Sequence, residues 1–238
     1  MVIIIAMAGL GTRFRNAGYN CPKYMIEAKG KTLFEWSLDS LKDYNSHVSK
    51  YIFVVRAEDN AGEFIREKSS SYDIPEIDII ELYHMTDGQA TTCMLALSRC
   101  KDDEAILIYN IDTYVEPYEM KYEAISGDGH IPCFKAEGTH WSFVKVDNSG
   151  KVVEVREKVR ISDNCSLGAY YFSSAGLYRE IYSEFYSGSA SMNEKYIAPM
   201  YNFMIEKGLN VTMSLINPEK VHVLGTPEEL KCWVKSGG

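Results

Sequence analysis

The sequence predicts an α/β fold with a mixed, mainly parallel sheet flanked by helices, and two observations support this prediction. Residues 2–5 form an uninterrupted β-branched run, which is typical of a strand buried on both faces. Strand and helix patterns then alternate, with a strand over 51–55, a polar helix over 58–68 and a strand over 77–82. In such sheets ligands bind at the carboxyl ends of the strands.

Composition limits the class of protein and its partners. The 238 residues are 46% hydrophobic without an apolar run of membrane length, and we expect one domain over 1–238 with no membrane partner. The apolar start lacks the basic region of a signal peptide, so we expect a cytoplasmic location, and the six cysteines, which lack C-x-x-C spacing, are expected to be reduced. The net charge of -8 argues against nucleic acid as a partner, so a phosphate site must be a local cationic pocket.

A glycine loop follows the first strand. The chain runs through Gly9-Leu10-Gly11-Thr12-Arg13-Phe14, and Pro22-Lys23 comes shortly after. Two glycines allow positive φ and close approach of a ligand, so the N–H groups of the loop can point at phosphate oxygens. Arg13 and Lys23 add cationic charge beside that loop. Residues 32–35, Thr-Leu-Phe-Glu, then form a capping box at the start of the next helix.

Two further strand ends carry polar residues. Asp112 lies just past the buried strand over 105–109, where a Mg²⁺ ligand for a triphosphate would sit, although a turn or capping aspartate fits the pattern equally well. Gly88 permits a tight turn before the apolar-faced helix over 93–97, and Asp87 or Thr86 can cap that helix.

The second half of the chain is more β-like. Strands are predicted over 131–135, 141–146 and 151–155, the last two joined by a hairpin turn at 147–150. Helices are predicted over 177–186 and over 193–202, and Pro199 should kink or restart the second of these. Glu194 precedes its apolar part, so its carboxylate could cap the helix or bind a substrate hydroxyl or amine. A strand over 221–224 precedes a helix with Thr226 as its cap, Pro227 at its first position and Glu229 closing a second capping box.

These motifs carry a family resemblance. Residues 8–14, Ala-Gly-Leu-Gly-Thr-Arg-Phe, with Pro22-Lys23 and Gly30-Lys31 downstream, resemble the signature of nucleotidyltransferases that join a nucleoside triphosphate to a phosphorylated small molecule. The sugar-1-phosphate nucleotidyltransferases usually have one more glycine in this loop. The resemblance implies a Rossmann-like sheet with the architecture of the nucleotide-diphospho-sugar transferases, which is GT-A-like.

The resemblance also implies roles for particular residues. The nucleotide would be bound by Ala8, Gly9, Leu10, Gly11 and Thr12 of the loop and by Gly88 and Gln89 of the turn. Arg13, Lys23 and Asp112 would be catalytic, with Asp112 holding Mg²⁺. The acceptor pocket would contain Glu157, Lys158 and Gly168, with Glu194 as an additional acceptor contact. In the family, an aspartate two residues before the glycine of the closing Gly-Thr-Pro-Glu-Glu-Leu motif supplies a second metal carboxylate, and Val223 stands there in this chain.

The implied reaction is nucleotidyl transfer with release of pyrophosphate. A pyrimidine nucleotide (CTP, UTP or dTTP) is favoured, and the acceptor is a sugar-1-phosphate or a non-sugar phosphate such as phosphocholine or phosphoglutamine, as in the synthesis of capsule or surface-polysaccharide precursors. A dinucleotide-binding oxidoreductase is one alternative, but Phe14 is too large for the third glycine position of that fingerprint. A non-catalytic nucleotide sensor is a second alternative, which Val223 supports. The sequence leaves open whether the chain is a monomer or a homodimer.

Overall fold

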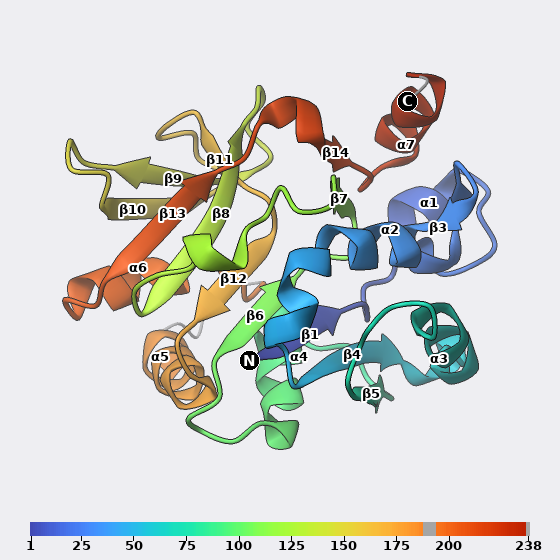
Figure 1. Ribbon diagram of the computed structural model, residues 1–238, viewed down its shortest axis with the longest axis horizontal. Helices are drawn as coiled ribbons and strands as arrows, with labels where there is room; N and C mark the ends of the chain where they lie inside the picture. The colour runs from blue at the N-terminus through green and yellow to red at the C-terminus, as the bar shows by residue number, and fades with distance from the viewer. Residues whose placement is uncertain (188–193, 237–238) are drawn as a thin grey trace.

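A mixed sheet forms the centre of the molecule. The computed structural model describes residues 1–187 and 194–236. The strands of the main sheet are β1 (Val2–Ala6), β4 (Lys50–Arg56), β5 (Ile77–Leu82), β6 (Ile106–Tyr109), β8 (Gly129–Lys135), β9 (Ser142–Val146), β10 (Val152–Glu157), β11 (Asn164–Ser166), β12 (Ala169–Phe172) and β13 (Val211–Leu215) (Figure 1). The order across the sheet is β10-β9-β11-β8-β12-β6-β1-β4-β5, and β13 pairs with β8.

Strand direction divides this sheet into two parts. Strands β6, β1, β4 and β5 run parallel to one another, so their carboxyl ends share one edge. Strands β12, β8, β11, β9 and β10 continue the sheet through antiparallel pairs. The predicted mixed α/β sheet is therefore confirmed, and its parallel part holds the loops that the sequence singled out.

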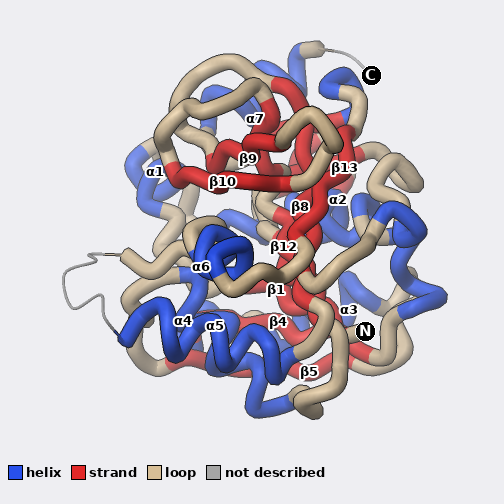
Figure 2. The backbone as a smooth tube through the Cα atoms, turned by 90° about the vertical axis from the view of Figure 1, so that its left-hand side faces the viewer, coloured by secondary structure: helices blue, strands red, loops and turns tan. Residues whose placement is uncertain are grey.

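Helices cover both faces of the sheet (Figures 1 and 2). They are α1 (Thr12–Asn16), α2 (Leu33–Ser40), α3 (Gly62–Ser69), α4 (Gln89–Ala96), α5 (Ala175–Ser187), α6 (Met200–Glu206) and α7 (Pro227–Lys235). Along β1, Val2 and Ile4 belong to the core that contains α4, α5 and α6, whereas Ile3 and Ile5 belong to the core that contains α2 and α3. Both sides of β1 are buried, which is why this strand is apolar at every position.

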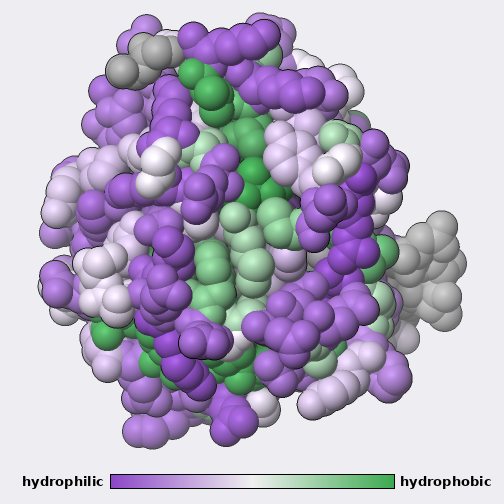
Figure 3. Space-filling model, turned by 90° about the vertical axis from the view of Figure 1, so that its right-hand side faces the viewer, coloured by the Kyte–Doolittle hydropathy of each residue, from purple (hydrophilic) through white to green (hydrophobic). Residues whose placement is uncertain are grey.

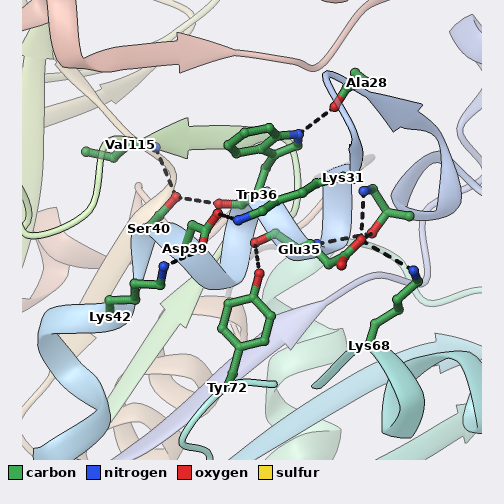
Figure 4. A network of polar contacts seen from close by, with 11 residues as sticks. Ala28, Lys31, Glu35, Trp36, Asp39, Ser40, Lys42, Lys68, Tyr72 and Val115 are labelled. Carbon is green, nitrogen blue, oxygen red and sulfur yellow. Dashed lines mark hydrogen bonds and ion pairs between the residues drawn. The ribbon is translucent and has the colours of Figure 1, made fainter. Parts of the chain in front are cut away.

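Helix α2 begins at the predicted capping box. The Thr32 Oγ1 atom accepts a hydrogen bond from the Glu35 N–H, and the Glu35 carboxylate accepts one from the Thr32 N–H. The Ser40 Oγ atom accepts a hydrogen bond of 2.9 Å from the Val115 N–H (Figure 4). Val115 belongs to β7 (Thr113–Val115), which pairs with β14 (Val221–Val223) in a separate two-stranded sheet. The capping box thus fixes the start of α2, and the Ser40–Val115 hydrogen bond attaches the β7–β14 sheet to this helix.

A buried carboxylate strengthens the attachment of α2. The Asp39 side chain is only 3% exposed, and the Lys31 and Lys42 ammonium groups lie 2.5 and 2.7 Å from its oxygens (Figure 4). Two cations offset the cost of removing this carboxylate from water. Lys31 comes from β3 (Lys31–Thr32), which pairs with β2 (Glu27–Ala28), so the contact joins this hairpin to the helix.

Two predicted helices were wrong in part. The helix predicted over 58–68 begins at Gly62, because Asn60 has a left-handed backbone (φ 47°) that ends a preceding 3₁₀ turn. Of the helix predicted over 193–202, residues 194–199 are not helical and residue 193 lies outside the described residues. Helix α6 begins at Met200 directly after Pro199, which lacks the N–H that a helix interior needs. Pro199 therefore marks the start of α6, and in the described residues it neither kinks nor restarts a helix, contrary to the prediction.

Two observations concern the molecule as a whole. All six cysteines are free thiols, as expected. In the described residues, no helix has the length and apolar character needed to cross a membrane.

A buried histidine gives the fold a predicted pH dependence. His130 of β8 is 1% exposed, and its ring nitrogens lie 2.7 Å from Thr212 Oγ1 and 3.0 Å from Ser214 Oγ of β13. Burial lowers the pKa of His130 to about 4. The unfolded chain, with a histidine pKa of about 6.5, therefore takes up this proton first, and stability falls as the pH drops from about 6.5 toward 4.

The expected loss from this group is about 2 kcal/mol of unfolding free energy between pH 7 and pH 5. Urea denaturation of the wild type and of His130→Gln at both pH values measures it, because other titrating groups are common to the two proteins. An equal loss of stability in both proteins would show that His130 does not titrate in this way.

Candidate functional site

The loops at the carboxyl ends of the parallel strands enclose a cleft. The arrows of β1 and β4 point to the right in Figure 1, and Figure 3, which shows that side, has a hydrophobic hollow between hydrophilic margins. The cleft has a volume of about 540 Å³ and lies between the glycine loop after β1 and the turn before α4. Its lining includes seven of the predicted residues: Ala8, Gly9, Lys23, Gly88, Gln89, Asp112 and Glu194. The structure therefore brings together the loop, the turn and the aspartate, which come from three distant parts of the sequence.

The glycine loop presents unused N–H groups. Gly11 has a left-handed backbone (φ 62°) and caps α1, and its carbonyl accepts hydrogen bonds from Phe14 and Arg15. Among the described residues, the N–H groups of Gly9, Leu10 and Gly11 have no hydrogen-bond acceptor. Such groups can bind phosphate oxygens.

Not every residue of the loop faces the cleft. Leu10 is 46% exposed and lines a separate hollow with Tyr83 and His84. Thr12 and Arg13 are exposed at the start of α1. Arg13 lines a second, smaller cavity and has no ion-pair partner among the described residues, so its charge is available to a ligand.

Lys23 and Asp112 form an ion pair in the cleft. The Lys23 Nζ atom lies 2.8 Å from Asp112 Oδ2, and the two side chains are 21% and 31% exposed. Burial raises the pKa of Asp112, but the charge and hydrogen bond of Lys23, with a smaller contribution from Arg13, lower it below its ordinary value overall. At neutral pH Asp112 is therefore an anion beside two cations.

The backbone around Asp112 is held from three sides. The carbonyl of Ile111 accepts a hydrogen bond of 3.0 Å from Ser37 Oγ of α2, and the Asp112 carbonyl accepts one of 2.8 Å from the Leu224 N–H. The Asn110 N–H donates to the Gly168 carbonyl at 2.9 Å. Helix α2, the segment after β14 and the turn before β12 thus fix the position of the carboxylate.

Gly168 packs directly against the Asn110 side chain. A Cβ atom at Gly168 would come within 2.3 Å of Asn110 Nδ2, and its φ of +77° also favours glycine. The Asn110 Oδ1 atom in turn accepts a hydrogen bond from Gln89 Nε2, so the amide of Gln89, a predicted nucleotide contact, is held by Asn110. Sequence reasoning missed Asn110, although it precedes Asp112 by only two residues.

The smaller cavity adjoins the cleft. Its volume is about 240 Å³, and it shares Gln89, Asn110 and Asp112 with the cleft. Its further lining includes the predicted residues Arg13, Glu157 and Gly168 and the aromatic residues Trp141, Tyr170 and Tyr196. Trp141 and Tyr196 were not predicted as site residues, because an aromatic residue in a predicted strand or helix is usually part of the core. Asp112 therefore stands where two cavities meet.

The remaining predicted acceptor contacts, Glu157, Lys158 and Glu194, differ in which cavity they line. Glu157 lines the smaller cavity and accepts a hydrogen bond from Ser142 Oγ. Lys158 is half exposed, and its Nζ atom donates to the Tyr196 hydroxyl at 2.7 Å, so it reaches the cavity only through Tyr196. Glu194 lines the larger cleft, and its carboxylate accepts a hydrogen bond from the Tyr196 hydroxyl. Glu194 thus lies in the larger cleft, and its predicted role as an additional acceptor contact stays a prediction.

A second carboxylate lies near Asp112. The Glu229 Oε2 atom is buried and has no hydrogen-bond partner among the described residues, and Glu229 lines the smaller cavity together with Asp112. The described part of the chain has no cluster of three or more His, Cys, Asp or Glu that could hold a metal ion. Mg²⁺ is commonly held by one or two carboxylates plus substrate phosphates and water, so these two oxygen donors fit such an ion.

Comparisons with known proteins place this geometry in a family. No protein-family model matches the chain, and a search of curated proteins finds no similar sequence. The crystal structure of a nucleoside-diphosphate-sugar pyrophosphorylase from Vibrio cholerae matches with a TM-score of 0.89 and 37% identity over 99% of this chain and 100% of that chain.

Two more distant structures share the fold. The inositol-1-phosphate CTP transferase from T. maritima has a TM-score of 0.76 at 16% identity, over 99% of this chain and 96% of that chain. The CTP:phosphocholine cytidylyltransferase from Streptococcus pneumoniae has a TM-score of 0.74 at 18% identity, over 99% of this chain and 98% of that chain. The identity to the Vibrio cholerae protein over the whole chain, together with this shared fold, shows that the chain belongs to the nucleotidyltransferase family with the nucleotide-diphospho-sugar transferase fold.

Proposed function

We propose that this protein transfers a nucleotidyl group from a nucleoside triphosphate to a phosphorylated small molecule and releases pyrophosphate. The observation that carries the proposal is the meeting of two cavities at Asp112, with Lys23 on one side and Arg13 on the other. A transferase needs two adjoining sites whose reacting groups meet at one point. The larger cleft would hold the triphosphate, and the smaller cavity would hold the acceptor.

Charge explains what the catalytic residues would do. Both reactants are anions, so catalysis depends mainly on offsetting their repulsion and holding the attacking and leaving oxygens in line. The free N–H groups of Gly9, Leu10 and Gly11 would bind the triphosphate, and Lys23 would contact the α-phosphate and the acceptor phosphate. Arg13, which lines the smaller cavity, would offset the negative charge of the phosphates where the two cavities meet. A phosphate oxygen of the acceptor attacks the α-phosphorus and no covalent enzyme intermediate is needed.

We further propose Mg²⁺ as the cofactor, held by Asp112. When bound, Mg²⁺ would supply positive charge that stabilises the phosphate oxygens in the transition state. The Lys23 ammonium beside Asp112 keeps that carboxylate ionised, which is the form that binds a cation.

The acceptor cavity supports a small substrate. At about 240 Å³ it is less than half the volume of the cleft, and its aromatic side chains offer faces to a sugar ring or to a cationic group. We therefore propose a sugar-1-phosphate or a non-sugar phosphate such as phosphocholine or phosphoglutamine as acceptor, and CTP, UTP or dTTP as donor. A cytoplasmic role in the synthesis of capsule or surface-polysaccharide precursors would suit such a product.

Pyrophosphate release tests this proposal. CTP, UTP, dTTP, ATP and GTP are each combined with sugar-1-phosphates, phosphocholine and phosphorylated amino acids in the presence of Mg²⁺. We expect release with one nucleotide and one class of acceptor, and none without the acceptor. Nucleotides that raise the melting temperature without any turnover across the panel would instead support a non-catalytic nucleotide sensor, the alternative that Val223 favours.

A further inference from the structure

We propose that Glu229 is the second carboxylate of the divalent cation site and takes over the role of the aspartate that Val223 replaces. This inference rests on the proposed function, because it concerns the same cation that Asp112 would hold. It starts from a buried acidic oxygen that the fold leaves without a partner.

The start of α7 explains why this oxygen is free. The Thr226 Oγ1 atom accepts a hydrogen bond of 3.1 Å from the Glu229 N–H, as the predicted capping box requires. The other hydrogen bond of the predicted capping box, from the Thr226 N–H to the Glu229 carboxylate, is absent from the described chain, so this part of the prediction was wrong. In the capping box of α2, by contrast, the Glu35 carboxylate binds back to its cap. The Glu229 carboxylate is therefore not used to cap its own helix.

The position of Gly225 places Glu229 beside Asp112. A Cβ atom at Gly225 would lie 3.3 Å from Asp112 Oδ2 and 3.5 Å from Glu229 Oε2, so one small space has both oxygens on its border. Asp112, Val223, Gly225 and Glu229 all line the smaller cavity. The valine side chain cannot bind a cation, whereas Glu229 reaches the same cavity from the first turn of α7.

Charge balance indicates when a cation is needed. Asp112 and Glu229 are countered by Lys23 and Arg13, the two cations that line the cavities beside them. A triphosphate would add several negative charges that this pair of cations would have to share. A divalent cation held by the two carboxylates would offset those charges. A buried, unpartnered carboxylate oxygen is also costly unless something binds it.

Binding of Mn²⁺ alone, followed by electron paramagnetic resonance, tests the proposal without nucleotide or acceptor. We expect Glu229→Gln to weaken Mn²⁺ binding by at least about ten-fold, since even loss of an outer-shell partner costs roughly that much. Gln keeps the backbone cap and the approximate volume of Glu. The matched control is Glu228→Gln, which removes the same charge from an exposed neighbour and should leave binding unchanged. Melting temperatures confirm that each variant is folded.

A second variant tests the replacement itself. Adding Val223→Asp to Glu229→Gln should restore most of the lost Mn²⁺ affinity. Loss without recovery would overturn the idea that Glu229 replaces the aspartate. Wild-type affinity in Glu229→Gln, an equal loss in Glu228→Gln, or no Mn²⁺ binding by the wild type would each overturn the whole proposal. Because the titration uses no substrate, it can fail while pyrophosphate release succeeds, and the reverse also holds.

Discussion

Replacing Lys23 with alanine should lower turnover by about 10²–10³-fold and weaken nucleotide binding by less than about ten-fold. The Lys23 ammonium lies 2.8 Å from Asp112 in the cleft, close to where the two cavities meet. Its charge would act on the oxygens that gain negative charge as the reaction proceeds, whereas several N–H groups of the glycine loop would still bind the nucleotide. Steady-state kinetics and nucleotide titration, carried out with the donor found by the pyrophosphate assay, measure the two effects separately.

Two variants serve as references for Lys23. Lys207→Ala removes a lysine that pairs with Glu180 and Glu184 and lines neither cavity, so it should leave turnover unchanged. Asp112→Asn added to Lys23→Ala should cost less than the sum of the two single effects, because the residues act as a pair. Equal losses of turnover and nucleotide affinity in Lys23→Ala would contradict a role specific to the transition state.

Replacing Gly88 with alanine should lower the unfolding free energy by about 2–5 kcal/mol and abolish tight nucleotide binding. A Cβ atom at Gly88 would lie 2.4 Å from the Lys195 carbonyl oxygen, and the φ of +148° is one that residues with side chains rarely adopt. The turn and the 194–196 segment are also joined by backbone hydrogen bonds of 2.8 Å from Lys195 N–H to Asp87 and of 3.0 Å from Ala90 N–H to Lys195. Alanine would push the turn at Gly88 away from the 194–196 segment, and both segments line the cleft.

Urea denaturation and nucleotide titration check this prediction. The matched control is Gly62→Ala, because Gly62 is at the start of α3, has no atom within 4 Å of its Cβ position and does not have a positive φ. It should be neutral or slightly stabilising, since alanine favours helix. A Gly88→Ala variant as stable as Gly62→Ala would show that the turn can move away from Lys195 at little cost.

The proposed nucleotide side of the site was largely predictable from sequence. The β-branched run of β1 and the strand of β6 are recognised from short stretches, and the residues that follow a parallel strand must lie at its carboxyl end. Lys23 and Asp112 could therefore be expected near each other, and the structure pairs them. Their catalytic roles, like those of Arg13 and the glycine loop, stay predictions.

The proposed acceptor side, the smaller cavity, was much less predictable. Trp141, Tyr170 and Tyr196 come from three separate segments, and only the antiparallel strands and the 194–199 segment bring them to one cavity. Glu194, predicted as an additional acceptor contact, lies in the larger cleft, a position that the sequence did not indicate. Sequence periodicity does not distinguish a strand tyrosine that lines a cavity from one that packs in the core. Both occupy alternate positions along the strand and point to the same face.

By itself, then, the sequence determined the α/β class, the glycine loop and the family, because those depend on side-chain periodicity, on backbone freedom and on motifs within a few residues of one another. The tertiary structure alone decided that Gln89 is held by Asn110, that Gly88 meets Lys195 and that the Glu229 carboxylate is left free beside Asp112. Each of those contacts joins segments far apart in the chain or depends on a side-chain rotamer. These contacts depend on packing and hydrogen bonding across the whole fold, and a local sequence pattern contains no information about them.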